Sequence, residues 1–351
     1  MQGVVSGRSI LITGAGGSLG SALAKAIVQL DPRHLILLDH SERNLHEIDS
    51  ELKANPPRVS HVSVLGDICD AGLLSEIFER HRPEIVYHAA AFKHVPLMER
   101  NPLAVVRNNA LGTDTLARIS RTAGISELVM VSTDKAVNPI SVMGASKRVA
   151  ELALLRRDNS RKHMRALRLG NILGSVGSVV PTFLLQISQG GPVTVTHPEV
   201  SRYFHTMSEA VELVLLTSAV EVGGGIFIPQ LGTPVKILDM ARQLVADFQS
   251  QSKSAQEIPV TITGLRPGDK MSEEFLAADE SAEPTSDIGL LRVNTVEMPS
   301  ERFDAHMEIL ARSVEQRNLP SMMEALCQMV PEYQPTEELD GLWQDSSVPL
   351  E

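Results

Sequence analysis

A glycine-rich turn directly after the first apolar run constrains the fold of this chain more than any other feature. The run Ser9–Ile12 is followed by Thr13–Gly20, which reads TGAGGSLG. Glycines spaced in this way permit a tight turn, close approach of backbone N–H groups to a pyrophosphate, and close packing of the next helix on the sheet. The turn therefore predicts a dinucleotide site, formed by Gly14, Gly16, Gly17, Ser18, Leu19 and Gly20.

Short runs rich in Ile, Val and Leu alternate with amphipathic stretches through the first 170 residues. The predicted strands are Ser9–Ile12, Leu35–Leu38, His61–Leu65, Ile85–His88, Leu128–Val131 and Ala166–Leu169. The predicted helices are Leu19–Leu30, Leu45–Lys53, Leu73–Arg80 and Met143–Arg156. Apolar runs without polar alternation are typical of strands buried on both faces. This order predicts an α/β fold with a Rossmann-type doubly wound parallel sheet.

The alternation of apolar runs and amphipathic stretches becomes less regular after Gly170, where glycine and proline residues are frequent. We predict a helix, a strand and a helix at Ser208–Val220, Ile226–Pro229 and Lys236–Phe248, and a loop over 276–300. We therefore expect an NAD(P)-binding domain followed by a smaller C-terminal substrate-binding lobe and a flexible tail. The expected boundaries are 1–170 with parts of 205–250 for the domain, 171–204 and 251–335 for the lobe, and 336–351 for the tail.

Composition excludes several classes of function. The 351 residues carry a net charge of -11, which argues against nucleic-acid binding because that requires a basic surface. Two cysteines, Cys69 and Cys327, predict no disulfide framework and fit a reducing cytoplasm. The longest apolar candidate, Val211–Val220, is short and interrupted by Glu212, so no membrane span is expected. Without a signal-peptide pattern at the start, we expect a cytoplasmic protein.

Carboxylates end the second and third predicted strands. Asp39 is placed to accept hydrogen bonds from ribose hydroxyls and to repel a 2′-phosphate, which favours NAD over NADP. Arg43 lies nearby and could serve a phosphate, so NADP stays possible. Asp67 could bind the adenine amine, cap the following helix, or do both.

The fifth predicted strand ends in Thr133, Asp134 and Lys135, and Met143 and Lys147 follow on one face of a predicted helix. In most short-chain dehydrogenases the last two positions hold Tyr and Lys, and the Tyr removes a hydroxyl proton. A thioether cannot act as an acid or base. The chain is therefore either a silent binding module or an enzyme that moves proton transfer to other groups. A lone Asp-Lys pair is usually a solvated pair of charges. Its position at the carboxyl end of a parallel strand, over the cofactor crevice, instead favours a catalytic role.

This stretch carries a specific resemblance. Ser132–Pro139 together with Met143–Lys147 resembles the UDP-N-acetylglucosamine 4,6-dehydratases of polysaccharide and glycan biosynthesis, in the branch where Met replaces Tyr. The likeness covers roughly residues 8–275. Its further segments are His88–Pro96, Asn109–Thr113, Arg168–Ser175, Gly177–Pro181 and Leu265–Lys270. The family usually forms closed assemblies, which implies a homo-oligomer.

The resemblance implies oxidation at sugar C4, loss of the C5 hydrogen with the C6 hydroxyl, and return of hydride to C6. Lys135 is then the C5 base and Asp134 the acid for the leaving hydroxyl. Thr133 and Lys147 handle the C4 hydroxyl, with Met143 in the Tyr position. A base requires that the pKa of Lys135 fall, which burial and Lys147 favour and Asp134 opposes. The implied cofactor contacts are Asp39, Ser41, Asp67, Ile68, Ala89, Ala90, Ala91, Asn109 and Lys147.

A UDP-sugar brings two negative charges that basic side chains must meet. The predicted substrate-binding residues are Lys93, His94, Asn171, Val180, Arg202, Arg266 and Glu273. Arginine suits bidentate phosphate contacts, although surface solubility is the alternative role of both arginines, and the Arg-Pro-Gly turn fixes the geometry of Arg266. A lone His without Cys or His partners predicts no metal. A 4-epimerase or reductase and a silent dinucleotide sensor remain alternatives, and the gluco or galacto substrate and the C5 configuration stay open.

Overall fold

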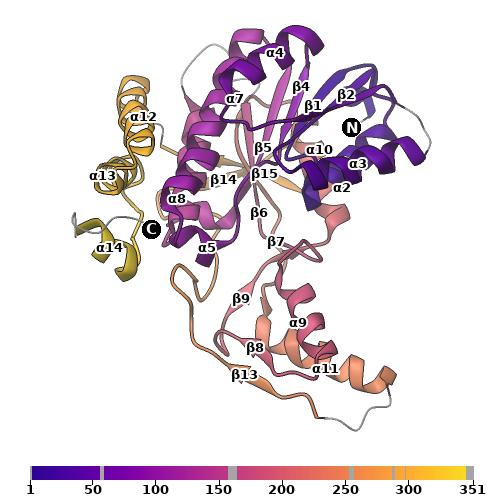
Figure 1. The fold of residues 1–351 in the computed structure, drawn as a ribbon, viewed down its shortest axis with the longest axis vertical. Coiled ribbons are helices and arrows are strands. Elements are labelled where there is room, and N and C mark those ends of the chain that lie inside the picture. The colour runs from indigo at the N-terminus through magenta and orange to yellow at the C-terminus, as the bar shows by residue number, and fades with distance from the viewer. Residues whose placement is uncertain are drawn as a thin grey trace.

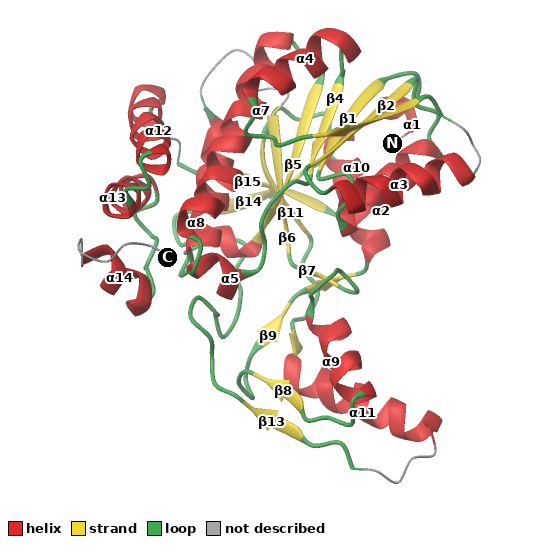
Figure 2. Cartoon of the chain, viewed as in Figure 1, coloured by secondary structure: helices red, strands yellow, loops and turns green. Residues whose placement is uncertain are grey.

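A nine-stranded sheet forms the centre of the molecule (Figure 2). The computed structural model describes residues 2–55, 59–156, 164–252, 257–286, 289–296 and 298–344. The strand order is β14-β15-β11-β6-β5-β4-β1-β2-β3, parallel from β3 to β11, with β15 and β14 antiparallel at one edge. The bounds are β1 Ser9–Thr13, β2 His34–Asp39, β3 His61–Leu65, β4 Ile85–His88, β5 Glu127–Thr133, β6 Met164–Leu169, β11 Gly225–Pro229, β14 Ser281–Pro284 and β15 Leu290–Asn294. The predicted doubly wound parallel sheet is confirmed.

Helices cover both faces of the sheet (Figure 2). One face carries α2 (Ser18–Val28), α3 (Glu42–Ala54) and α10 (Met207–Ala219), and the other carries α4 (Ala71–His81), α7 (Gly112–Ala123) and α8 (Val142–Leu155). Successive residues of β1 enter opposite clusters, since Ile10 and Ile12 pack with α2 whereas Leu11 packs with α4 and α7. Burial on both faces explains why the strands read as continuous apolar runs.

The chain between β4 and β5 is helical, which the sequence pattern did not predict. Its elements are α5 (Val95–Glu99), α6 (Pro102–Val105), the π-helix η1 (Val106–Leu111) and then α7. A short helix α1 (Gln2–Val5) precedes the sheet, and a 3-10 turn η2 (Asp134–Ala136) follows β5. Across the ranges that the structure describes, no helix is both long and apolar enough to cross a membrane.

A smaller lobe lies beyond the carboxyl ends of the strands (Figure 1). It combines α9 (Val179–Ser188), β8 (Val193–Val195), α11 (Ile237–Ser252) and β13 (Val260–Ile262) around one apolar cluster. Two short pairings, β7 (Asn171–Ile172) with β10 (Phe204–His205) and β9 (Ser201–Arg202) with β12 (Val235–Lys236), lead into it. Of the range 205–250, expected to belong in part to the Rossmann domain, α10 and β11 pack with the large sheet, whereas the apolar side of α11 packs on α9 and β8.

The C-terminal third also differs from expectation. Residues 276–300 were predicted as a loop, but they contain β14 and β15, whose partly exposed positions at the sheet edge hide the apolar pattern of a strand. Helices α12 (Ser300–Glu315) and α13 (Leu319–Met329) pack on α8 and η1 rather than on the lobe (Figure 1). Helix α14 (Glu337–Gln344) forms where a flexible tail was expected, and residues 345–351 lie outside the described residues.

Candidate active site

The glycine-rich turn brings backbone N–H groups to the switch point between β1 and β4. Gly14 has φ +68°, and a Cβ there would lie 2.7 Å from the backbone of Ala90. A Cβ at Gly20 would collide with the carbonyl oxygen of Gly14. Gly17 caps α2 without a side-chain hydrogen bond. The first N–H groups of this helix are therefore available to an anion, as a dinucleotide pyrophosphate requires.

Asp39 is locked beside this turn. The N–H of Gly16 donates to Oδ2 at 2.9 Å and the N–H of Ser41 donates to Oδ1 at 2.8 Å. Ser41 also caps α3 with its hydroxyl. The carboxylate of Asp39 is 5% exposed. Arg43 instead pairs with Glu47 at 3.0 Å along α3. The geometry holds a fixed negative charge at the end of β2.

Asp67 lies at the end of the neighbouring strand β3. It accepts hydrogen bonds from the N–H of Cys69 and from Arg107, both at 2.8 Å. Burial raises the pKa of Asp67, but these hydrogen bonds outweigh it and lower the pKa below its usual value. The helix-cap role for Asp67 was wrong, because Asp70 caps α4. The neighbouring Ile68 packs its side chain into the core, 4% exposed.

Asn109 holds the loop that follows β4. Its Oδ1 accepts from the N–H of Phe92 at 2.9 Å, and its Nδ2 donates to the Phe92 carbonyl at 3.0 Å and to Ser146 Oγ at 3.1 Å. These hydrogen bonds give the buried side chain a positioning role, and its direct contact with a cofactor stays a prediction. Asn109 fixes the segment Ala89–His94 against α8 from within a π-helix, a turn found often at functional sites. The loop begins with Ala89, Ala90 and Ala91, and a backbone hydrogen bond ties Ala89 to Thr13.

The predicted catalytic residues converge at the end of β5. Thr133 Oγ1 donates to Asp134 Oδ1 at 2.9 Å, and Lys135 Nζ donates to the same oxygen at 2.9 Å. The amine of Lys135 also donates to Asn171 Oδ1 at 3.2 Å and lies 3.5 Å from Glu273 Oε1. Asp134 is fully buried, and the side chain of Lys135 is 22% exposed. The pair therefore turns into the protein rather than into bulk solvent.

Two carboxylates decide the direction of the pKa shift of Lys135, which the sequence left open. Burial alone would lower the pKa of Lys135, but the negative charges of Asp134 and Glu273 outweigh it and raise the pKa above its usual value. The raised pKa favours the ammonium form of Lys135, whereas a base for the C5 hydrogen requires the neutral amine. The sequence did not reveal that Glu273, far along the chain, would add a second carboxylate.

The two residues on α8 have separate environments. Lys147 is 3% exposed, and its amine donates to the carbonyl of Val131 at 2.8 Å. Burial lowers the pKa of Lys147 to about 8, although the charge of Glu151 opposes this. Met143 is also 3% exposed and packs in the apolar cluster that α12 and α13 complete. Met143 thus fills space behind the site, while Lys147 brings an amine that titrates near neutral pH.

Arg202 does not have the free guanidinium that phosphate binding needs. Its Nη1 donates to the carbonyls of Ser201 and Met271, and its Nη2 donates to the carbonyl of Lys270. Its Nε lies 3.6 Å from Glu273 Oε1, and the residue is 9% exposed. The predicted phosphate contact is corrected to a clamp that ties the segment around Glu273 to β9.

The remaining predicted substrate residues, Arg266, Lys93, His94 and Val180, lie outside the contacts of Lys135 described above. Arg266 is exposed, and its Nε donates to Asp269 at 2.8 Å. Lys93 and His94 are exposed, and a Cβ at Gly177 would lie 2.5 Å from His94 Cε1, so the two loops meet there. Val180 lies in the first turn of α9 and is half-buried.

Two histidines near the site were missed, the buried His88 and the half-buried His205. His88 bridges the hydroxyls of Thr13 at 2.6 Å and Thr113 at 2.9 Å. Burial, helped by the charge of Lys147, lowers the pKa of His88 to about 3, so the ring is neutral. His205 lies on β10 next to β7, and its Nε2 is buried without a hydrogen-bond partner. A polar residue that ends a buried strand was the available signal for His88, whereas no motif marked His205.

A C-terminal segment braces the catalytic loop from behind. The N–H of Gln334 donates to the carbonyl of Pro139 at 3.0 Å. Thr336 Oγ1 donates to Glu99 Oε2 at 3.0 Å, and Glu99 Oε1 accepts from the first N–H of α8, that of Val142. These contacts fix the loop between Lys135 and Met143. No local pattern in the sequence predicted this packing.

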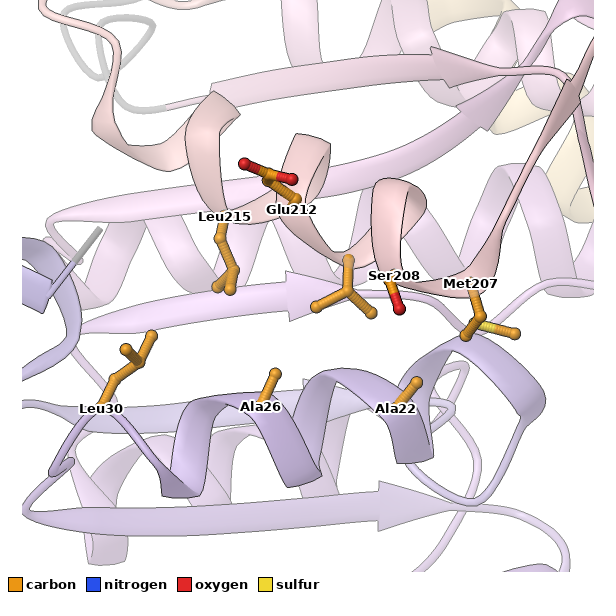
Figure 3. A pocket seen from close by; sticks show the side chains of 8 residues that line it. Ala22, Ala26, Leu30, Met207, Ser208, Glu212 and Leu215 are labelled. Carbon is orange, nitrogen blue, oxygen red and sulfur yellow. The ribbon is translucent and has the colours of Figure 1, made fainter.

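Two grooves lie apart from these residues. One of about 400 Å³ runs between α2 and α10, floored by Ala22, Ala26 and Leu215 and edged by Glu212 (Figure 3). The other, of about 750 Å³, lies beside α4 and α7. Neither contains a predicted site residue. Across the part of the chain that the structure describes, no cluster of three His, Cys, Asp or Glu residues could hold a metal ion.

Comparison with known proteins shows which family this chain resembles. Residues 10–294 match the polysaccharide biosynthesis protein family. The capsular polysaccharide biosynthesis protein CapD of Staphylococcus aureus is 46% identical over 279 residues, 79% of this chain and 46% of that protein. The chain thus spans about half the length of that relative.

A second relative and a solved structure cover more of their own lengths. The inverting UDP-N-acetylglucosamine 4,6-dehydratase of Campylobacter jejuni is 30% identical over 282 residues, 79% of each chain. The dTDP-glucose 4,6-dehydratase DesIV of Streptomyces venezuelae, solved with NAD bound, aligns with TM-score 0.65 at 23% identity and covers 76% of this chain and 87% of that one. The match to the family model covers most of this chain, and the Campylobacter jejuni relative is 30% identical over 79% of both proteins. This chain therefore belongs to the polysaccharide biosynthesis protein family.

Proposed function

We propose that the protein is an NAD(P)-dependent UDP-N-acetylglucosamine 4,6-dehydratase, or acts on a close UDP-N-acetylhexosamine. The observation that carries the proposal is the buried Asp134–Lys135 pair at the carboxyl end of β5. Elimination of water from a sugar needs a base for a carbon-bound hydrogen and an acid for the leaving hydroxyl. The pair supplies both functions within 2.9 Å of each other.

The charge state of the pair suggests how it becomes active. The raised pKa of Lys135 favours the ammonium form, which cannot remove a carbon-bound hydrogen. Transfer of one proton along their hydrogen bond gives an amine and a carboxylic acid, which are the base and the acid. A neutral sugar that displaces water from the pocket favours this uncharged pair, because low polarity disfavours separated charges. Lys135 then removes the C5 proton, and Asp134 protonates the C6 hydroxyl.

The C4 hydroxyl needs its own proton acceptor, since Met143 cannot supply one. Thr133 lies next to Asp134 and is the hydroxyl that can orient the C4 oxygen. Lys147, with its pKa lowered to about 8, is an amine that is partly neutral near neutral pH and can receive the proton. A bound nicotinamide would accept hydride from C4 and return it to C6.

The cofactor site fits NAD better than NADP. A dinucleotide pyrophosphate fits the uncapped start of α2, and Asp39 is fixed where the adenosine ribose would lie. A 2′-phosphate would meet this buried carboxylate, and Arg43 is already paired with Glu47. We further propose a cytoplasmic homo-oligomer that acts in polysaccharide biosynthesis.

Two other functions were considered. A 4-epimerase or reductase would need a hydroxyl acid at position 143, where the structure has a buried methionine. A silent dinucleotide sensor has no use for a buried acid–amine pair that faces a second lobe. Both alternatives predict that UDP-N-acetylglucosamine gives no 4-keto-6-deoxy product.

The test incubates the purified protein with UDP-N-acetylglucosamine and measures the product by mass and by proton NMR in deuterated water. We expect loss of one water and one solvent-derived hydrogen at C5. Lys135→Gln should abolish the product, whereas the matched control Lys53→Gln, on the exposed side of α3, should not. Unchanged substrate with the wild-type protein would contradict the proposal.

A further inference from the structure

Buried polar atoms without partners gather between the sheet and the lobe. Asp134 Oδ2, Glu273 Oε2 and His205 Nε2 are each sealed from solvent and make no hydrogen bond within the protein. Buried polar atoms are almost always paired, because an unpaired one costs about 1–3 kcal/mol. Asp134 and Glu273 both pair with the amine of Lys135, and these unpaired atoms therefore point to a polar ligand that completes them.

The backbone fixes His205 at the same corner as the catalytic pair. β10 pairs with β7, with Phe204 opposite Asn171 and His205 opposite Ile172. The N–H of Leu173 donates to the carbonyl of His205 at 2.9 Å. Asn171 in turn accepts the hydrogen bond from Lys135. The ring of His205 is thus held by the strand that also contacts the catalytic amine.

Asp134 and His205 are close enough to interact electrostatically. Burial lowers the pKa of His205, although the negative charges of Glu209 and Asp134 oppose the shift. The ring is therefore neutral near neutral pH, and a neutral imidazole offers one donor and one acceptor nitrogen. A hydroxyl group placed between Asp134 Oδ2 and His205 Nε2 would satisfy both atoms.

We propose that His205 is a further catalytic residue whose Nε2 hydrogen-bonds the C6 oxygen of the sugar during elimination. This inference rests on the proposed function. In the step, the C5–H bond breaks and its proton goes to Lys135. The electron pair forms the C5–C6 double bond and the C6–O bond breaks. The carboxyl group of Asp134 turns so that the oxygen protonated by Lys135 faces the C6 oxygen, and its proton completes the departing water. His205 gains and loses no proton and holds the oxygen as hydroxyl and then as water.

The test compares His205→Leu and His205→Gln with the wild type, following product formation and the near-ultraviolet absorbance of reduced nicotinamide. His205→Leu should lower kcat roughly 10–100-fold, as expected for one hydrogen bond to a reacting group, with KM within about threefold. Reduced cofactor should accumulate during turnover, because C4 oxidation continues while elimination is slow. His205→Gln keeps a polar group at this position and should recover about tenfold of the loss.

A control and three outcomes make the proposal falsifiable. His46→Leu, on the exposed side of α3, should behave as the wild type. Wild-type kcat in His205→Leu overturns the proposal, and so does a loss of kcat without reduced cofactor, because both half-reactions then suffer equally. Equal losses in the Gln and Leu variants would indicate a packing role instead. If the wild type forms no product, the proposed function itself fails. If the wild type forms product and only the results for the His205 variants differ from expectation, this inference alone fails.

Discussion

Two buried ionic clusters begin at adjacent residues of β5 and differ in one respect. From Ser132, hydrogen bonds lead to Glu151, then to Arg168 and Glu280. From Thr133, hydrogen bonds lead to Asp134 and Lys135, and an ion pair of 3.5 Å joins Lys135 to Glu273. We refer to them as the Arg168 cluster and the Lys135 cluster.

The Arg168 cluster is saturated. Both oxygens of Glu151 accept hydrogen bonds from Arg168 at 2.9 Å, and one also accepts from Arg148 at 3.0 Å. Both oxygens of Glu280 are bound by Arg168 as well. In the Lys135 cluster, by contrast, Asp134 and Glu273 each keep one unpaired oxygen. A saturated network stabilises one arrangement, and an unsaturated one has capacity left for a ligand.

The largest expected effect concerns the Lys135 cluster. Asp134→Asn keeps the shape of the side chain but removes the acid, so the rate of dehydration should fall about 10²–10⁴-fold. Its free energy of unfolding should change by about 1 kcal/mol or less, since an amide can keep the hydrogen bonds of Thr133 and Lys135. Product formation and urea unfolding on the same sample measure both quantities. A variant that unfolds readily would erase the distinction between the clusters.

The opposite pattern is expected for Arg168→Met. The change leaves Glu151 and Glu280 buried without their main partner and should cost about 3–5 kcal/mol of unfolding free energy. Activity per folded molecule should fall far less than in Asp134→Asn. Urea unfolding and an activity assay at matched folded fraction provide the comparison. An unchanged midpoint of unfolding would show that the network adds no stability.

The loss of unfolding free energy at low pH gives a further test of the Arg168 cluster. Burial raises the pKa of Glu151, but Arg168 and other hydrogen-bond donors outweigh it and lower the pKa to about 2 from a usual 4.5. This carboxylate stabilises the fold above its unfolded pKa and loses that contribution as pH falls toward its folded pKa. The loss is about 3 kcal/mol at most. Urea unfolding between about pH 7 and about pH 3 should show this slope in the wild type and a shallower one in Arg168→Met.

Lys147 belongs to neither cluster. We expect its titration to have a smaller effect, which appears in activity and not in stability. If its neutral amine receives the C4 proton, kcat/KM should rise about tenfold per pH unit and level off above about pH 8, where the lowered pKa of Lys147 lies. Lys147→Arg should flatten this rise because arginine stays charged. A wild-type profile that is flat between about pH 6 and about pH 9 would exclude the role.

The smallest effect is expected where the C-terminal segment meets α5. Thr336→Val removes the hydroxyl that donates to Glu99 at 3.0 Å and should cost about 1 kcal/mol of unfolding free energy. Thermal unfolding measures the change, with Thr182→Val on the exposed side of α9 as the matched control. Equal shifts in both variants would argue against a brace.

Local patterns predicted the sheet and the residues at its carboxyl edge. Strands buried on both faces are continuous apolar runs, so β1 to β6 were found within a few residues. The glycine turn, Asp39 and the Asp134–Lys135 pair each follow directly from a strand end. What lay close in sequence was therefore predictable.

The rest depends on contacts between distant residues. Arg168 and Glu280 are 112 positions apart, and no local pattern pairs them. Arg202 was expected to bind phosphate, but backbone carbonyls brought in from 270 and 271 occupy its guanidinium. The raised pKa of Lys135 has the same origin, since Glu273 arrives from the far side of the lobe.

The packing of the C-terminal helices bears on how the protein can be shortened. The family match ends at residue 294, yet Phe303 and Met323 belong to the apolar cluster that contains Met143. A protein truncated at 294 would expose this apolar side of α8 to water and lose the backbone hydrogen bond between Gln334 and Pro139. Such a fragment would tend to self-associate, and its inactivity would reveal nothing about the chemistry of the intact chain.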